Sequence, residues 1–173
     1  DTGAMLAKVH CQISPAETGG SLHDKLAELG PPALLDTLSA IARGTISPEQ
    51  QDDSQACYAA KITKQEAELD WRRPAIELER QIRAFNPFPV SHSQFDGQQL
   101  RVWRAHRLNK PGHGAPGTIV AVTADSLEVA CGDQVLAIEE IQLPGKKRLA
   151  VAEILRGNAE LFAVGKQFSG SSL

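Results

Sequence analysis

The chain has 173 residues, of which 42% are hydrophobic and 23% charged, and this composition is ordinary for a globular protein of one or two small domains. It contains no run of about 18 apolar residues and no charged-then-apolar leader, so we expect neither a membrane span nor a signal peptide, and a cytoplasmic location. The net charge of -3 hides an asymmetry, because residues 1–60 are acidic whereas residues 61–173 carry a small basic excess.

The first residues alternate in the manner of a β-strand. Apolar side chains occupy every second position from residue 5 to residue 13, and Ser14 and Pro15 end the pattern. We expect this strand, together with the helices that follow it, to form the edge of an α/β unit over residues 1–45.

Helical segments are expected after this strand. Ser21 and Asp24 have the spacing of a capping box, so a helix should begin at about Leu22. Gly30 and the two prolines after it interrupt the apolar period, which then resumes and continues to Gly44.

Residues 46–69 form the expected linker between two domains. From residue 45 to residue 58 the composition changes to Gln, Asp, Ser, Pro and Glu with little apolar periodicity, which is typical of a segment that crosses a surface. The pattern therefore places the domain boundary between residues 45 and 70.

Residues 70–168 have the pattern of a small, mainly β barrel with flanking helices. Pro74 suits a first helical position, and Leu78, Ile82 and Phe85 form an apolar stripe after it. Gly, Pro, Asn and Asp then separate short apolar runs at residues 100–103, 117–122, 126–130 and 135–141. A last helix is expected near residues 151–155, and residues 169–173 form a tail.

The Cys, His and Gly residues show no catalytic or metal-binding motif. The three Cys are far apart without a Cys-x-x-Cys pair, and the five His lack metal-ligand spacing. No Gly-rich phosphate loop follows a strand, and no Gly-x-Ser-x-Gly elbow occurs. A disulfide framework, a metal centre and a hydrolase triad are therefore poor interpretations.

Basic residues are the remaining candidates for a functional site. They occur on the linker, on the helix after Pro74, around Trp103 and after Pro144, and the candidate nucleic-acid contacts are Lys61, Lys64, Arg80, Arg83, Arg101, Arg104, Lys146, Lys147 and Arg148. Each group alone is compatible with an ordinary solvated surface. Together, on a barrel, they are typical of a face that binds a phosphate backbone.

Several segments resemble the methionyl-tRNA formyltransferases. The opening residues, Asp1-Thr2-Gly3-Ala4-Met5-Leu6, are similar to the Asp-Thr-Gly-x-Met-Leu segment of that family. Lys61 and Lys64, followed by Leu69-Asp70-Trp71, resemble the family's linker, and Arg83-Ala84-Phe85-Asn86-Pro87 resembles the start of its C-terminal domain.

This resemblance implies a division of labour along the chain. Residues 1–45 would be the C-terminal remnant of a Rossmann-like formyltransferase domain, and residues 70–168 would be an OB-like domain that holds the tRNA. Phe88 stands where the family often has Trp, an exchange that should leave the packing intact.

The resemblance also implies a reaction. In the family a formyl group moves from 10-formyltetrahydrofolate to the amino group of methionyl-initiator-tRNA, and the Asp that matches Asp1 acts with an upstream Asn and His. A carboxylate beside an imidazole would hold the proton that the attacking amine sheds. Neither partner has an equivalent here, and most of the folate pocket is expected before residue 1. We therefore expect these residues alone to be an inactive, metal-free monomer that chiefly binds tRNA.

Two other interpretations remain open. One is a stand-alone nucleic-acid-binding barrel without catalysis. The other is a related folate-dependent formyltransferase that acts on a nucleotide sugar or hydrolyses the folate. The linker at residues 61–71 favours the tRNA enzyme.

Overall fold

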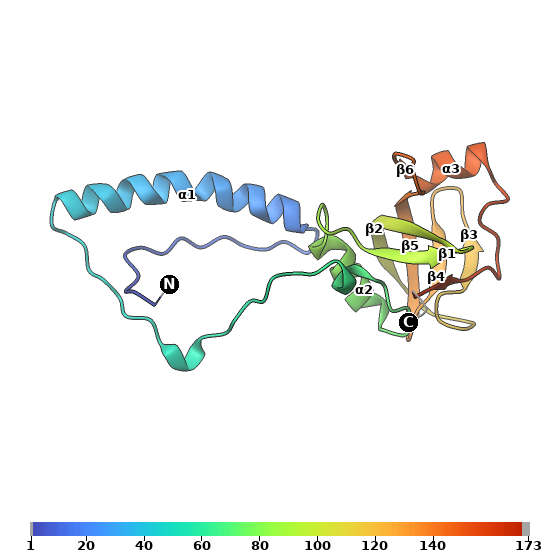
Figure 1. The fold of residues 1–173 in the computed structure, drawn as a ribbon, viewed down its shortest axis with the longest axis horizontal. Coiled ribbons are helices and arrows are strands. Elements are labelled where there is room, and N and C mark those ends of the chain that lie inside the picture. Colours follow the sequence, from blue (N-terminus) through green and yellow to red (C-terminus); the bar gives the residue numbers. More distant parts are fainter. Residues whose placement is uncertain (1, 171–173) are drawn as a thin grey trace. The chain divides into compact units, whose positions relative to one another are not determined.

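A computed structural model describes residues 2–170, and the chain divides into two compact units, Asp1–Lys61 and Ile62–Leu173 (Figure 1). Residues 62–69 belong with the second unit, since Ala67 and Leu69 are buried and the Leu69 amide donates a 2.9 Å hydrogen bond to the His92 carbonyl. The assignment of residues 1–45, 46–69 and 70–168 to a catalytic remnant, a linker and a tRNA-binding domain remains a prediction.

The first unit contains the helix α1 (Gly19–Ala42) and the short 3-10 helix η1 (Asp53–Gln55), joined by extended segments. None of residues 2–61 is buried, and Leu34, Leu35 and Leu38 on α1 are exposed. Apolar burial among these residues therefore contributes little to holding the unit together.

The strand expected at residues 5–13 is not formed, which corrects the prediction of a strand there, whereas the α/β edge of residues 1–45 remains a prediction. Met5 alone makes a bridge, to Glu49, through two backbone hydrogen bonds of 2.8 and 2.9 Å. A strand requires a neighbour that continues the hydrogen-bond ladder, and residues 2–61 supply none beyond this bridge. The alternating pattern was thus insufficient without a pairing partner.

The helix α1 is continuous, although two separate pieces were expected. Pro31 and Pro32 lie inside it and cannot donate backbone hydrogen bonds to the carbonyls of Ala27 and Glu28. Both of these residues are exposed, so water can satisfy the two carbonyls. This access to water allows the helix to pass through the prolines.

The capping box of α1 lies one turn earlier than expected. The Thr18 hydroxyl accepts a 3.1 Å hydrogen bond from the Ser21 amide, and the Ser21 hydroxyl accepts a 3.0 Å bond from the Thr18 amide. Ser21 is therefore the third helical residue and not the N-cap.

The second unit is a curled antiparallel sheet with flanking helices. The helices are η2 (Gln65–Ala67), α2 (Ala75–Ala84) and α3 (Val151–Gly157). The strands are β1 (His92–Phe95), β2 (Gln98–Pro111), β3 (Ile119–Val122), β4 (Leu127–Ala130), β5 (Gln134–Gln142), β6 (Arg148–Ala150) and β7 (Phe168–Ser169). The helices predicted after Pro74 and near residue 151, and the four predicted strand regions, are confirmed.

The strands of residues 62–170 run in the order β3-β4-β5-β2-β1-β7, and β6 pairs with the end of β5. The two outer strands approach each other, because Thr118 and Gln167 form an antiparallel bridge and the Phe168 amide donates to the Gly117 carbonyl over 2.8 Å. The sheet therefore curls until its edges meet.

The core of this unit lies inside the curl. Helix α2 packs against β2 and β5, and α3 packs against β5 and β6 (Figure 1). Leu78 and Ile82 of α2 are buried as their spacing predicted, and Phe95, Phe162 and Phe168 form an aromatic cluster with centroid distances of 4.8 to 6.3 Å.

Among residues 2–170, no helix is long and apolar enough to cross a membrane. The same residues contain no group of three His, Cys, Asp or Glu side chains placed to hold a metal ion.

Candidate nucleic-acid interface

The loop that leaves α2 is held in a defined position against β2. The Asn86 side-chain amide donates a 3.1 Å hydrogen bond to the Trp103 carbonyl, and the Val90 amide donates a 3.0 Å bond to the Phe85 carbonyl. The peptide bonds before Pro87 and Pro89 are cis. Phe88, between these prolines, is 68% exposed. The exchange of Trp for Phe, which was expected to leave the packing intact, therefore concerns a ring that the loop turns towards solvent.

A hollow of about 390 Å³ lies beside this loop, and we call it the Phe88 pocket. Its lining consists of residues 87–90 together with Lys64, His92, Gln99, Arg101 and Trp103. Aromatic, cationic and neutral polar groups thus share one depression, between the loop after α2 and the strands β1 and β2.

Trp103 on β2 is fixed by two contacts. Its indole Nε1 donates a 3.2 Å hydrogen bond to the Gln142 side chain, and the Arg148 guanidinium lies over the ring at 4.9 Å from the centroid. A cation over an aromatic face is a stabilising arrangement. Trp103 therefore connects the Phe88 pocket with the end of β5 and the start of β6.

Two carboxylates on β5 neutralise part of the basic surface. Arg104 lies 2.8 Å from Glu139 and 3.2 Å from Glu140, and Arg148 donates a 2.6 Å hydrogen bond to Glu140. His106 lies 3.1 Å from Glu139. The positive charges of Arg104 and Arg148 are therefore partly neutralised by these carboxylates, and both Arg contact Glu140.

The basic side chains of α2 are in a different setting. Arg83 lies 3.7 Å from Glu79, as expected from their spacing of four residues, and Arg80 lines a hollow that also includes Glu66 and Glu77. Carboxylates in that hollow lower its attraction for phosphate. The helix is thus a weaker candidate for RNA contact than the Phe88 pocket.

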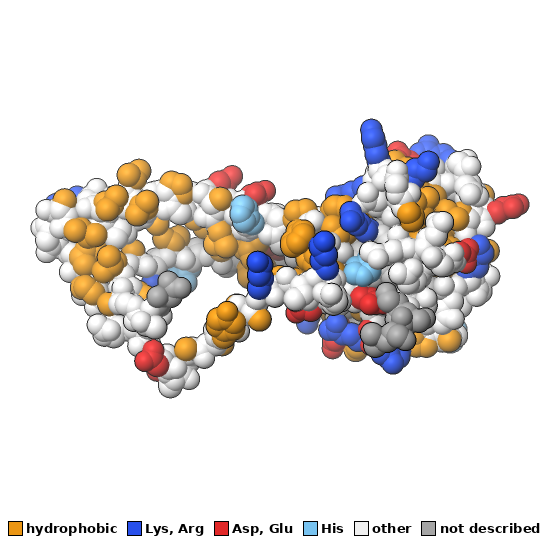
Figure 2. Space-filling view, viewed as in Figure 1, with side chains coloured by type: hydrophobic (Ala, Val, Ile, Leu, Met, Phe, Trp, Pro, Cys, Tyr) orange, Lys and Arg blue, Asp and Glu red, His pale blue; other side chains and the backbone are white. Residues whose placement is uncertain are grey.

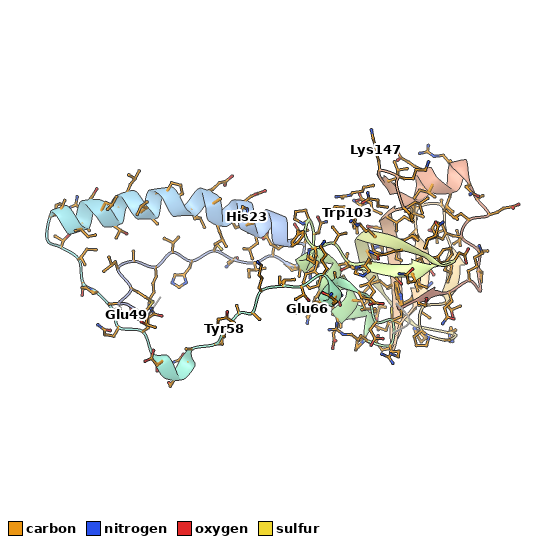
Figure 3. All side chains as sticks on the ribbon, viewed as in Figure 1. His23, Glu49, Tyr58, Glu66, Trp103 and Lys147 are labelled. Atoms are coloured by element: carbon orange, nitrogen blue, oxygen red, sulfur yellow. The ribbon has the colours of Figure 1, made fainter. Side chains whose placement is uncertain are left out.

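The exposed cations of β2 and the β5–β6 loop lie close together. A second hollow, of about 220 Å³, is lined by Gln99, Arg101, Gln142 and residues 143–145, so it shares Arg101 with the Phe88 pocket. Lys146 and Lys147 follow directly and are exposed, and Lys147 points away from the sheet (Figure 3). Several Lys and Arg side chains are visible on this unit in the space-filling view (Figure 2).

Two predicted site residues stand apart from this group. Lys61 is exposed at the end of the first unit. Asp1, the candidate catalytic residue, lies outside the described residues.

Residues 61–159 match the family model described as "Formyl transferase, C-terminal domain". The chain belongs to this formyl transferase family. The resemblance that the sequence motifs indicated is therefore confirmed. The family assignment covers the η2 segment, α2, the strands β1 to β6 and α3, which include the Phe88 pocket and its basic surroundings.

Curated relatives agree with this family assignment. A protein of Pseudomonas putida F1 named methionyl-tRNA formyltransferase is 51% identical over 166 residues, covering 96% of this chain and 53% of the relative. A protein of the same name from Pseudomonas fluorescens SBW25 is 51% identical over 165 residues, covering 95% of this chain and 51% of the relative. The chain spans about half the length of these relatives.

Solved structures show the fold at lower identity. A variant of HypX from Aquifex aeolicus matches with a TM-score of 0.68 and 18% identity, over 93% of this chain and 29% of that one. WlaRD, described as a sugar 3N-formyl transferase, matches with a TM-score of 0.51 and 14% identity, over 76% of this chain and 46% of that one. At these identities the two matches show a shared fold alone, and no substrate follows from them.

Sequence reasoning missed the polar and aromatic partners of the basic residues. Phe88 had been noted only as a replacement for Trp, His92 had been considered only as a possible metal ligand, and Gln99 had not been considered. A ring between two prolines was the available signal, because proline restricts the backbone on both sides and hinders the chain from folding the ring inward.

Proposed function

We propose that this chain is the C-terminal part of a methionyl-tRNA formyltransferase and that its second unit binds the tRNA. The observation that carries the proposal is the identity of 51% over 96% of the chain to a protein of that name. With 96% of the chain covered, the match extends into both units. The name of the relative supplies the substrate class, and this chain supplies a basic face suited to it.

Phosphate is the chemical group that this face would recognise. Arg101, Lys146 and Lys147 are exposed, and Lys64 lines the same pocket as Arg101. Guanidinium groups can form paired hydrogen bonds with phosphate oxygens, whereas ammonium groups act as mobile point charges. Such contacts give affinity that depends on salt and little on base sequence.

We propose a smaller contribution from Arg104 and Arg148. Glu139 and Glu140 hold these side chains, so a phosphate would have to compete with carboxylates that are already in place. Arg80, Arg83 and Lys61 remain candidate contacts on the basis of their type alone.

We propose the reaction for a protein as long as the relatives, of which this chain would be one part. The amino nitrogen of methionyl-initiator-tRNA would attack the formyl carbon of 10-formyltetrahydrofolate and form a new C–N bond. The bond between the formyl carbon and N10 of the folate would break, the amine would lose a proton, and N10 would gain one as tetrahydrofolate leaves. Asp1 is proposed to assist the proton transfer. In such a protein Asp1→Asn should lower the rate about 10²- to 10⁴-fold. These 173 residues contain only the Asp of the proposed Asp, Asn and His set. By themselves they should therefore not catalyse formyl transfer.

The curled sheet supports an OB-like assignment for the second unit. Its outer strands β3 and β7 meet at the Thr118–Gln167 bridge, which supports a small barrel in which loops and one face bind nucleic acid. A cytoplasmic monomer remains an expectation.

A salt titration tests the tRNA-binding role. Binding of initiator tRNA and an elongator tRNA is measured for the chain and for Lys146→Glu/Lys147→Glu, with Lys146→Arg/Lys147→Arg as the charge-preserving control. The logarithm of affinity should fall linearly with the logarithm of salt concentration, and each lost phosphate contact should lower the slope by about 0.7 to 0.9. Both tRNAs should respond alike, because these contacts do not read bases.

Three outcomes separate the possibilities. Absence of salt-dependent tRNA binding by the unmodified chain would overturn the proposed role of the second unit. If Lys146→Glu/Lys147→Glu binds tRNA with an unchanged salt dependence, the β5–β6 loop is not part of the tRNA-binding face. A much larger loss for initiator tRNA than for the elongator would show that the loop reads sequence or shape.

A further inference from the structure

We infer that the Phe88 pocket is a binding subsite for one unpaired nucleotide of RNA, whose base stacks on Phe88 while Lys64 and Arg101 hold the adjacent phosphate. The inference rests on the proposed tRNA-binding function and assigns that function a specific contact. It goes beyond a basic face, because it requires an aromatic ring and an unstacked base.

The exposure of Phe88 is the first observation. Its ring is 68% exposed, whereas Phe95, Phe162 and Phe168 are buried in the aromatic core. Within residues 62–170, Phe88 is the one aromatic side chain in the exposed class. A large ring in water gives up the favourable burial that the other Phe residues gain. A ligand that covers the ring would recover it.

The rigidity of the loop is the second observation. Val90 follows the ring with a φ of 67°, is 5% exposed, and donates its amide to the Phe85 carbonyl. A β-branched residue seldom adopts this left-handed conformation, and such strain persists where the surrounding structure enforces it. The hydrogen bond from Asn86 to Trp103 fixes the other side. Phe88 is thus presented by a pre-organised loop, which lowers the entropic cost of binding.

The charge in the pocket is the third observation. The cationic side chains of Lys64 and Arg101 line it, and no Asp or Glu is among its described lining residues. This differs from Arg104 and Arg148, which share Glu140, and from the hollow on α2, which contains two Glu. An aromatic ring together with uncompensated cations favours a ligand with an apolar planar face and a negative group. An unpaired nucleotide has both features.

The size of the pocket is compatible with this ligand. Its volume of about 390 Å³ falls within the range of roughly 300–1,000 Å³ that small-ligand pockets occupy. Gln99 adds a side-chain amide that can hydrogen-bond the edge of a base. A base-paired nucleotide would be unsuitable, because its faces are already stacked within the helix.

The decisive variant is Phe88→Ala. The probes are initiator tRNA, a single-stranded oligoribonucleotide of seven residues, and the duplex of that oligoribonucleotide with its complement. The variant should weaken binding of the first two about 5- to 100-fold, since stacking of one base on an aromatic ring contributes on this scale. The slope against salt should not change, because no ionic contact is removed. The affinity for the duplex should stay the same.

Three further variants give the controls. Phe88→Trp should preserve or raise the affinity, and its added indole emission should be quenched by the single strand beyond the quenching seen in the unmodified chain. Arg101→Gln should lower the salt slope by about 0.7 to 0.9. Val164→Ala changes another apolar side chain, 65% exposed and away from the pocket lining, and should leave binding unaffected. Thermal unfolding should be nearly the same for Phe88→Ala and the unmodified chain.

The outcomes distinguish this inference from the function on which it rests. If the unmodified chain binds tRNA and Phe88→Ala binds it equally well, the stacking site is overturned while the basic face stands. If Phe88→Ala loses affinity equally for the single strand and the duplex, the stacking site is also overturned, because the ring would then contribute to binding without an unpaired base. If no probe binds to the unmodified chain at low salt, the proposed function itself fails.

Discussion

Asp133, in the turn between β4 and β5, accepts a 2.8 Å hydrogen bond from the backbone amide of Ala75, 58 residues earlier. Ala75 is the first residue of α2, and Pro74 before it provides no side-chain cap. A carboxylate at this position satisfies an otherwise unpaired amide and interacts favourably with the helix dipole. The Gly132 amide also donates to the Arg73 carbonyl over 3.0 Å. The β4–β5 turn therefore holds the start of the helix that precedes the Phe88 pocket.

The loss of this distant cap should be measurable. Asp133→Ala should lower the free energy of unfolding by about 1 kcal/mol, within the range for N-cap replacements. Asp133→Asn is the matched control and should retain much of the stability, because its amide oxygen can still accept the Ala75 hydrogen bond. Urea unfolding monitored by circular dichroism provides the measurement. Equal midpoints for all three proteins would show that the cap contributes nothing.

The meeting of the sheet edges should be sensitive to one side chain. A Cβ added at Gly117 would lie 2.2 Å from the Phe168 carbonyl oxygen, and the residue has a φ of +89°. Gly117→Ala must therefore displace β7 or change the backbone conformation, and should cost about 2–3 kcal/mol of unfolding free energy. Gly157→Ala, at the end of α3, is the control because, apart from its chain neighbours and its own helix backbone, no atom lies within 4 Å of its added Cβ. Similar thermal midpoints for the two variants would contradict this account of the edge contact.

Cys131 should be chemically silent in the folded protein. Burial raises the pKa of its thiol to about 12, so the reactive thiolate is nearly absent at pH 8. Cys57 is exposed. Timed alkylation with iodoacetamide, followed by mass spectrometry, should modify Cys57 quickly and Cys131 only after unfolding in urea. Rapid native labelling of Cys131 would contradict its burial.

The same thiol should affect stability at alkaline pH. As pH rises from about 9 towards 12, the unfolded chain loses its thiol proton before the folded chain does. Unfolding then becomes more favourable, so this stabilising contribution is present below about pH 9 and is lost above it. Cys131→Ala should show a shallower decline of the unfolding midpoint across this interval, measured against the unmodified chain.

Hydrogen exchange should differ between the two units. Residues 5–13 carry one backbone bridge and none of them is buried, whereas residues 119–129 lie largely in the paired strands β3 and β4. Amides in the first segment should exchange quickly and those in the second slowly, because protection follows backbone pairing and burial. Comparable protection of both segments would show that the first unit is more ordered than its packing implies.

Local pattern was sufficient for several elements of the second unit. The stripe of Leu78, Ile82 and Phe85 predicted α2, and the apolar runs bounded by Gly, Pro, Asn and Asp predicted the positions of four strands. Family motifs were sufficient for the family assignment. These signals depend on residues a few positions apart, whose conformations are decided mainly by propensity and by one buried face.

Strand pairing was beyond the reach of such signals. The short strands β1 and β7 pair through Gln94 with Ser169 and Phe95 with Phe168, more than seventy residues apart in each case. The segment at residues 5–13 had a convincing alternation and yet formed no strand, because its backbone groups lack a continuing ladder. A strand is stabilised by its neighbour, and only the tertiary structure decides which neighbour is present.

The candidate site divides in the same way. Sequence alone identified the family and the basic residues, and it predicted a tRNA-binding role for residues 70–168. The register of β2 and β5 then placed Arg104 opposite Glu140, and the pairing of β5 with β6 brought Arg148 to the same carboxylate. Arg101 kept its place beside Lys64 in a pocket without carboxylates. Charge along a chain is set by composition, but which charges neutralise one another depends on distances that only the folded sheet creates.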